Sequence, residues 1–563
     1  MTDPPRLAPS PWQPQRRYWQ RIVGAMAVLT AAATLMATPP EQTRGRGRAS
    51  PPDKRSEPPR PRAPKEDKRE PLLRGEEALA RVYDAILDAR FAQVDADIRR
   101  ACGSSTPPGT GPAPAEACHV LEATALWWRI QLDPENRDLD DEFVTSVDRA
   151  IRTTEAWTAR APEEAEPWFY LGGAYAARVQ WRVLREEKLA AARDGKRIKD
   201  ALERALTIEP DLDDAYFGIG MYRYYADVAP AAARFLRFLL LLPGGDRKDG
   251  LAQMLRARSQ GRLLQGEADY QLHIIYLWYE HQTDRALRLL DDLRERYPRN
   301  PLFAMQVAEI QDVYAHDVMA SLGTWQSLLT LTRSDRVNEA DVAEVRARLG
   351  IARHLETLAE TDEAIDQLRQ IIALKPSTPY ASLATAYLRL GEAYDRVNAR
   401  SDAIAAYRSA LDATPPDDRR NLRRDAAERL RKTPNAAHAE AYRLSLDGWR
   451  KLEQKDLNAA KFALERSLAL NPRDPIARYR AGRVLEARGE YDEARREFEA
   501  SLREARTCPP PIVGRVYLAL AHTHERVGAR AAAITAYRTA ATLFGAGADT
   551  HRAAARALTR LAQ

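Results

Sequence analysis

Histidines, cysteines and paired acids, the side chains that most often carry catalysis or bind metals, are scattered in this sequence. His522 and His524 are two positions apart, so on a helix they point away from each other, unlike the i, i+4 pair of a zinc protease. Glu116, Cys118 and His119 crowd together, but an adjacent Cys and His on one helix cannot both ligate a metal comfortably. No G-x-S-x-G nucleophile motif and no C-x2-C pair occurs. The sequence therefore predicts no catalytic residue, no metal site and no cofactor.

A second candidate is the turn at residues 242–255, LPGGDRKDGLAQML, which has the glycines and basic residues of a phosphate-binding loop. It lacks the G-x4-G-K-[ST] spacing and no strand pattern precedes it, so a nucleotide site is not expected. An active site assembled across several repeats of residues 75–340 would contain none of these short motifs. That alternative stays open.

The three cysteines exclude a disulfide-rich scaffold. Cys102 and Cys118 flank the flexible segment SSTPPGTGPAP, which would let the two thiols meet. An oxidising compartment would permit a disulfide there, and two unrelated reduced thiols are the open alternative. Cys508 stands before three prolines with no His or Asp beside it, so it is not expected to act as a nucleophile.

The net charge of +6 belongs to the N-terminal part of the chain. Residues 1–21 carry +3, residues 22–40 carry no charge and residues 41–70 carry +4, so the rest of the chain sums to −1. A protein that binds nucleic acid concentrates basic residues on its folded surface. This distribution therefore predicts no nucleic-acid partner.

Residues 1–38 have the pattern of a signal peptide or signal anchor. The basic flank RRYWQR precedes the uncharged run IVGAMAVLTAAATLMA at residues 22–37. Such a run is short for a bilayer span of about 20 residues and fits the hydrophobic region of a secretory signal. Because the basic flank stays cytoplasmic, we expect a periplasmic or cell-envelope protein, either secreted or tethered to the inner membrane through residues 22–37. A spurious signal on a cytoplasmic protein is the alternative.

After this segment the chain changes character twice. Residues 39–71 are rich in Pro and Arg with almost no large apolar residues, which predicts a disordered linker. Helical periodicity then begins, with Leu79, Val82 and Ile86 on the first apolar stripe. The chain is far too long for one compact core and strand patterns are scarce, so we expect several helical domains or one long solenoid.

Two consecutive helical hairpins at residues 441–505 repeat one pattern of small, aromatic and Pro positions. Ala460 and Ala494 are equivalent in the two copies and stand 34 residues apart, and Gly448 and Gly482 are equivalent as well. This spacing resembles the tetratricopeptide repeat. The resemblance implies an all-α fold, a solenoid in which helical hairpins form a right-handed superhelix, and a protein that binds other proteins.

Looser copies of the hairpin extend the solenoid over the rest of the chain. Residues 72–340 are a divergent block, in which the hairpin opened by Trp168 and Gly172 is lengthened by the insertion RVLREEKLAAARDGK. Residues 341–416 contain clearer hairpins, residues 417–437 a charged linker or helix, and residues 438–563 a C-terminal block that ends in a capping helix.

Within the divergent block, residues 214–255 loosely resemble the central region of the tetratricopeptide repeat protein 39 family, where an apolar helix meets a Gly-Asp-Arg/Lys turn. The resemblance implies a helical, non-catalytic architecture and no particular function. The apolar run at residues 231–242 is predicted to be a buried core helix. The many aromatic residues from Tyr216 to Tyr279 favour packing between long helices, and a groove that anchors a peptide is the alternative.

In tetratricopeptide arrays the first helix of each hairpin lines the concave face. The resemblance places Trp449, Tyr479, Arg483 and His522 there as partner-binding residues. None of the four is Lys or Asn, so the carboxylate clamp that grips chaperone tails is not expected. A groove of aromatic and cationic side chains suits a peptide segment or an acidic partner.

The sequence as a whole thus predicts a non-catalytic scaffold of the bacterial cell envelope that binds a protein or peptide. An enzyme, or an accessory subunit of one, with its site in residues 75–340 is one alternative, and a cytoplasmic regulator is another. The identity of the partner, the cleavage of the signal and the oligomeric state are not predicted.

Overall fold

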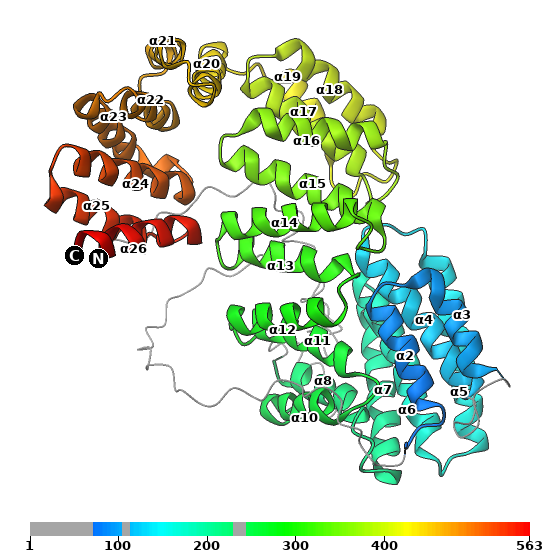
Figure 1. The fold of residues 1–563 in the computed structure, drawn as a ribbon. Helices are drawn as coiled ribbons and strands as arrows, with labels where there is room; N and C mark the ends of the chain where they lie inside the picture. The colour runs from blue at the N-terminus through cyan, green and yellow to red at the C-terminus, as the bar shows by residue number, and fades with distance from the viewer. Residues whose placement is uncertain (1–70, 104–112, 229–243, 563) are drawn as a thin grey trace. The chain divides into compact units, whose positions relative to one another are not determined.

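A computed structural model describes residues 71–103, 113–228 and 244–562. These residues form helices and no strand, which confirms the all-α prediction for them (Figure 1). None of their helices is both long and apolar enough to cross a membrane. The predicted signal segment at 1–38, the predicted linker up to residue 70 and the apolar run at 231–242 lie outside the described residues. The chain divides into two compact units, at residues 71–299 and 300–562, a division that falls inside the predicted 72–340 block.

The N-terminal unit (residues 71–299) is a succession of antiparallel helices (Figure 1). Cys102 and Cys118 form a disulfide between its second and third helices, so the structure shows the bridged alternative for these thiols. Its helices are α2 (Glu76–Leu87), α3 (Phe91–Cys102), α4 (Ala115–Leu132), α5 (Asp140–Arg160), α6 (Ala165–Leu184), α7 (Lys188–Ile208), α8 (Ala215–Val228), α10 (Arg247–Gln260), α11 (Gln265–Trp278) and α12 (Thr283–Arg296).

Aromatic side chains of α8 and α11 fill the space between the helices of this unit. Tyr224 and Tyr225 are completely buried, and their rings meet edge to face with centroids 5.7 Å apart. Tyr270 is buried against Trp128 of α4, with ring centroids 4.9 Å apart. Because buried aromatic rings contribute large apolar areas to a core, these contacts confirm the packing interpretation for these residues.

The C-terminal unit (residues 300–562) continues with shorter and more regular hairpins. Its helices are α13 (Pro301–Val313), α14 (Val318–Arg333), α15 (Ala340–Thr357), α16 (Thr361–Leu374), α17 (Ser382–Arg396), α18 (Arg400–Ala413), α19 (Leu422–Arg431), α20 (Ala436–Glu453), α21 (Leu457–Leu470), α22 (Pro475–Ala487), α23 (Tyr491–Arg503), α24 (Pro510–Arg526), α25 (Arg530–Thr542) and α26 (Ala548–Ala562). The charged region at 417–437 contains α19, which packs through Leu422 and Ala426 into the core of α17 and α18.

Local sequence signals explain where several of these helices begin. The Asp474 side chain accepts hydrogen bonds from the backbone N–H groups of Ile476 and Ala477, and Pro475 occupies the first helical position of α22. Asp456 caps α21 in the same way. An aspartate at this position satisfies backbone donors that have no partner inside the helix, and a proline there loses none. These capping residues thus specify in the sequence where α21 and α22 begin.

In three hairpins of the C-terminal unit a glycine on the first helix faces a large side chain on the second. A Cβ atom added at Gly482 would lie 2.4 Å from the ring of Phe498, and one added at Gly391 would lie 2.4 Å from the ring of Tyr407. In the same way Gly448 leaves room for Leu464. Ala460 and Ala494, whose spacing indicated the repeat, are both completely buried. The repeat spacing therefore corresponds to one packing contact that recurs in these three hairpins.

The helices of the C-terminal unit wind round so that α22 and α24 return to the turn between α15 and α16 (Figure 1). Ala359 in that turn shares a buried core with Tyr479 of α22 and Ile512 of α24. Arg515 of α24 pairs with Glu360 of the same turn at 3.3 Å. The turn between α15 and α16 therefore packs against α22 and α24, which follow much later in the chain.

Candidate functional site

The four residues predicted to bind a partner lie on the first helices of three consecutive hairpins, α20, α22 and α24. Trp449 and Tyr479 approach each other with ring centroids 6.1 Å apart. Arg483 follows Tyr479 by one turn of α22, and His522 stands on α24. The structure therefore brings all four onto one face of the C-terminal unit, which we call the α20–α22–α24 face.

Two members of this set are partly or wholly covered. Tyr479 is only 7% exposed, because its ring packs against Phe498 and the Ala359 turn. Trp449 lies partly buried beside the same core. The contacts of Tyr479 are those of a core residue. Fewer of the four predicted residues are therefore accessible to a partner than the sequence indicated.

Arg480 belongs to this face and is missing from the predicted set. It is 3% exposed, with its guanidinium 5.9 Å from the ring centroids of both Tyr442 and Trp449. Its two terminal nitrogens donate hydrogen bonds to the Ser445 hydroxyl at 2.9 Å and to the Ala359 carbonyl at 2.6 Å. A buried charge is stable only when it is paired or hydrogen-bonded. Arg480 therefore ties α20 and α22 to the Ala359 turn, a partner 121 positions away in the chain.

The accessible part of the face is a polar group centred on Glu486. Its carboxylate pairs with Arg483 Nε at 2.9 Å and with His522 Nδ1 at 2.6 Å. The side chains of Arg483 and His522 are 42% and 57% exposed, whereas that of Glu486 is 11% exposed. Burial works to lower the pKa of the Arg483 guanidinium, but the neighbouring Tyr479 and Glu486 raise it above its ordinary value. The arrangement presents a cation and an imidazole held in place by a covered carboxylate.

Ion pairs continue along the edge of the face. Arg450 of α20 pairs with Asp362 of α16 at 3.3 Å, and both side chains are well exposed. Surface pairs of this kind contribute little to stability and exchange readily with other charges. Arg450, Arg483 and the edge residue Arg515 thus offer cationic groups around a partly buried aromatic centre.

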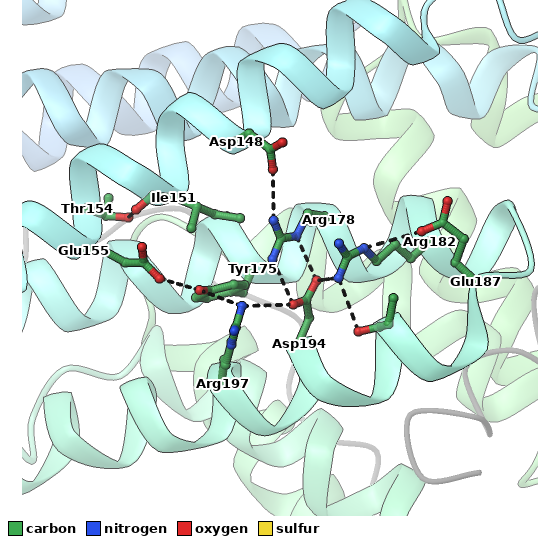
Figure 2. Close-up of polar contacts among 11 residues, drawn as sticks. Asp148, Ile151, Thr154, Glu155, Tyr175, Arg178, Arg182, Glu187, Asp194 and Arg197 are labelled. Carbon is green, nitrogen blue, oxygen red and sulfur yellow. Dashed lines mark hydrogen bonds and ion pairs between the residues drawn. The ribbon is translucent and has the colours of Figure 1, made fainter. Parts of the chain in front are cut away.

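The divergent N-terminal unit contains buried charges of a different kind. Asp194 of α7 is 1% exposed and accepts bonds from Arg178 of α6 at 2.8 and 2.9 Å and from Arg182 at 2.5 Å (Figure 2). The third nitrogen of Arg178, Nη1, donates a hydrogen bond to Asp148 of α5 at 2.9 Å. Figure 2 also shows Arg197 directed at the same carboxylate. Every charge in this group is paired, and its effect is to hold α5, α6 and α7 together.

The structure also shows the surroundings of the histidines and cysteines that could act in catalysis or bind a metal. Burial lowers the pKa of His273 and of His354 to about 3, so both are neutral core residues. Burial raises the pKa of the Cys508 thiol to about 12. His119 lies next to the bridged Cys118 and contacts the Thr153 hydroxyl at 3.2 Å. In the described part of the chain no three His, Cys, Asp or Glu side chains come together as a metal site would require.

Comparison with known proteins supports the repeat. The model of the tetratricopeptide repeat matches residues 451–512, which span the α21–α22–α23 region. No curated protein sequence matches the chain. The resemblance of residues 214–255 to the tetratricopeptide repeat protein 39 family is not supported and stays a prediction.

Three proteins are named among the solved structures that the chain matches. The TPR2AB domain–pHSP90 complex of yeast Sti1 is 15% identical and covers 53% of this chain and 99% of its own, with a TM-score of 0.20. The human IFIT1 dimer with m7Gppp-AAAA is 13% identical over 74% of this chain and 78% of its own, with a TM-score of 0.29. Yeast Tom70 is 13% identical over 78% and 96%, with a TM-score of 0.23. The matched segment and the repeated glycine contacts of the hairpins show that this chain contains tetratricopeptide repeats.

Proposed function

We propose that the protein is a non-catalytic scaffold that binds a protein or peptide partner on the α20–α22–α24 face. Solenoid repeats create extended curved surfaces of this kind and use them for binding. The observation that carries the proposal is the accessible Arg483–Glu486–His522 group beside Trp449, built from two adjacent first helices. Aromatic and arginine side chains of this kind are the residues that dominate binding energy at protein interfaces.

The charged side chains of the α20–α22–α24 face indicate which kind of partner would bind there. Arg483 and Arg450 are exposed cations whose present partners, Glu486 and Asp362, are carboxylates of the same chain. A partner carboxylate would compete for these two guanidinium groups, because hydrogen bonds between charged groups are strong. An extended segment with acidic side chains and one apolar or aromatic residue over Trp449 therefore fits best.

The proposal includes a place for the protein in the bacterial cell envelope, exported or tethered through residues 22–37. Its support is the signal-like sequence and the Cys102–Cys118 disulfide, because disulfides form and persist in oxidising compartments. Fractionation of cells that express the tagged full chain tests this part. We expect the protein in the periplasmic or membrane fraction with Cys102 and Cys118 blocked to thiol reagents. A soluble cytosolic pool with both thiols reactive would support the cytoplasmic alternative and refute export.

The partner-binding part is tested by affinity capture followed by a binding measurement with the partner identified. We expect Arg483→Ala and Trp449→Ala each to weaken binding about tenfold or more, as truncation of a central interface residue does. Arg496→Ala is the matched control, because Arg496 on the second helix α23 is 60% exposed and lies off the face. Circular dichroism and thermal unfolding verify that each variant is folded. Equal binding by all three variants would refute the assignment of the face.

A further inference from the structure

The N-terminal unit contains an apolar cavity of about 120 Å³ that no feature of the proposed scaffold uses. Its walls come from α2, α4, α6, α7, α8 and α11, all within residues 71–299. Leu121, Phe169, Ile198 and Phe217 are among the lining side chains. An apolar pocket with a few convergent polar groups is the usual form of a small-molecule site.

Small residues on α6 keep the cavity open. A Cβ atom added at Gly173 would meet only a Val120 methyl group, at 3.5 Å, so the position is large enough for a side chain that the sequence does not supply. Ala176 and Ala177 follow on the same helix and also line the cavity. By contrast, a Cβ atom at the neighbouring Gly172 would lie 2.6 Å from Leu202, so that glycine is required for helix packing. Packing therefore explains Gly172 and leaves Gly173 unexplained.

Two carboxyl groups line the cavity, and both are satisfied by the protein itself. Glu267 accepts hydrogen bonds from the Tyr83 hydroxyl at 3.1 Å, the Trp128 indole at 3.2 Å and the Gln271 amide at 3.3 Å. Asp214 accepts three backbone N–H groups, from residues 262, 263 and 264. Among the described lining residues there is no Lys, Arg or His. An anion would meet only like charge here, and a cation would lose its water for carboxyl groups that are already bonded.

One polar group at the cavity has no partner. Tyr170 lines the cavity and is 2% exposed, and within the described residues its hydroxyl has no hydrogen-bond partner. A buried hydroxyl without a partner is unfavourable, and in native proteins such groups are rare and call for a specific explanation. A bound molecule that supplies one hydrogen-bonding group would remove the deficit.

We propose that this cavity binds a small, uncharged, mainly apolar molecule whose single hydrogen-bonding group engages the Tyr170 hydroxyl. The size agrees, because an engineered apolar cavity of about 150 Å³ in another protein holds one benzene molecule. The ligand class is therefore an aromatic or branched aliphatic compound about the size of one six-membered ring with one polar substituent. The cavity belongs to the N-terminal unit, whereas the partner-binding face belongs to the C-terminal unit.

Phenol and toluene are suitable probes, because they have nearly the same shape and differ in the hydroxyl group. Titration calorimetry on the full chain is expected to show saturable binding of both. Gly173→Leu places a side chain in the cavity, and because filled volume excludes a ligand we expect the affinity for both probes to fall by about tenfold or more. Gly323→Leu is the matched control, since nothing lies within 4 Å of a Cβ atom added at Gly323 in α14.

The role of the hydroxyl is tested separately. Tyr170→Phe is expected to weaken phenol binding about three- to tenfold, the effect of one lost hydrogen bond, and to leave toluene binding within about twofold. Tyr225→Phe removes another buried hydroxyl without a partner in the described structure, at a residue that does not line the cavity, and should change neither affinity. No binding of either probe to the folded protein, or unaltered binding to Gly173→Leu, would overturn the proposal. An equal effect of Tyr170→Phe on both probes would overturn the hydrogen bond. None of these results depends on whether Arg483→Ala weakens binding of the protein partner, so the two proposals can fail separately.

Discussion

The two compact units solve the same packing problem with different interactions. In the C-terminal unit a hairpin is closed by a glycine and a large side chain close in sequence, such as Gly482 and Phe498. In the N-terminal unit the long hairpin of α6 and α7, with 20 and 21 residues, is joined by the buried Asp194 ion pairs, and Tyr83 bonds Glu267 from 184 positions away. Short apolar contacts repeat with a fixed spacing, whereas long-range polar contacts do not. A unit held by polar contacts therefore loses its repeat signature while keeping its architecture.

The strongest test of this contrast removes the central charge of the N-terminal unit. Asp194→Asn leaves Arg178 and Arg182 without their buried counter-ion, and breaking a buried pair in this way costs about 3 kcal/mol or more. The free energy of unfolding should therefore fall by about this amount. Hydrogen exchange of α6 and α7 peptides in increasing denaturant measures it for this unit alone.

Asp200→Asn on the same helix is the matched control. Asp200 pairs with Lys196 at 2.5 Å, but both side chains are about half exposed. Exposed pairs contribute roughly 0–1 kcal/mol, so this variant should unfold almost as the parent protein does. Equal effects of the two substitutions would mean that buried ion pairs do not hold the N-terminal unit together.

The corresponding test in the C-terminal unit overfills a hairpin contact. Gly482→Leu forces a side chain into the Phe498 ring and should lower the free energy of unfolding by about 1–3 kcal/mol, the usual effect of overpacking. Gly323→Leu gains helix propensity in open space and should be neutral or slightly stabilising. Chemical denaturation of both variants gives the comparison. Unaltered stability of Gly482→Leu would show that the repeated glycine is not a packing requirement.

The same contrast explains which features the sequence could predict. The spacing of Ala460 and Ala494 predicts the hairpins because the contacts that it reports are made within one or two neighbouring helices. The predicted face on α20, α22 and α24 follows from that repeat. The burial of Tyr479 and the role of Arg480 could not be predicted, because both depend on the Ala359 turn, which curvature brings to them from another part of the chain.

The N-terminal cavity was missed for a related reason. Its only local sign is the pair Gly172 and Gly173, in which one glycine fits the repeat pattern and the other has no packing role. Glu267 at the cavity meets Tyr83 of α2 and Trp128 of α4 only in the folded chain, and Asp214 likewise meets the backbone of residues 262–264. A second glycine beside a repeat glycine is thus the local sequence feature that could have indicated the cavity.

The smallest expected effect concerns pH and compares one buried histidine in each unit. His273 in the N-terminal unit and His354 in the C-terminal unit have folded pKa values of about 3, against an ordinary value of 6.5, because burial disfavours the charged ring. Below pH 6.5 the unfolded chain binds a proton that the folded chain does not bind. The free energy of unfolding therefore falls as the pH drops from about 6.5 towards 3, by roughly 1 kcal/mol per histidine between pH 6.5 and 5.5.

His354→Gln separates the two units in this experiment. Glutamine keeps a polar group near the Ser321 hydroxyl, which lies 2.8 Å from the histidine ring, and it does not titrate. The variant should lose roughly 1 kcal/mol of pH dependence between pH 6.5 and 5.5 in hydrogen exchange of α14 and α15. Peptides from α11, the helix that contains His273, should keep theirs. If the pH dependence of both regions falls together, the two units unfold as one cooperative body, and the two ways of packing do not give them separate stabilities.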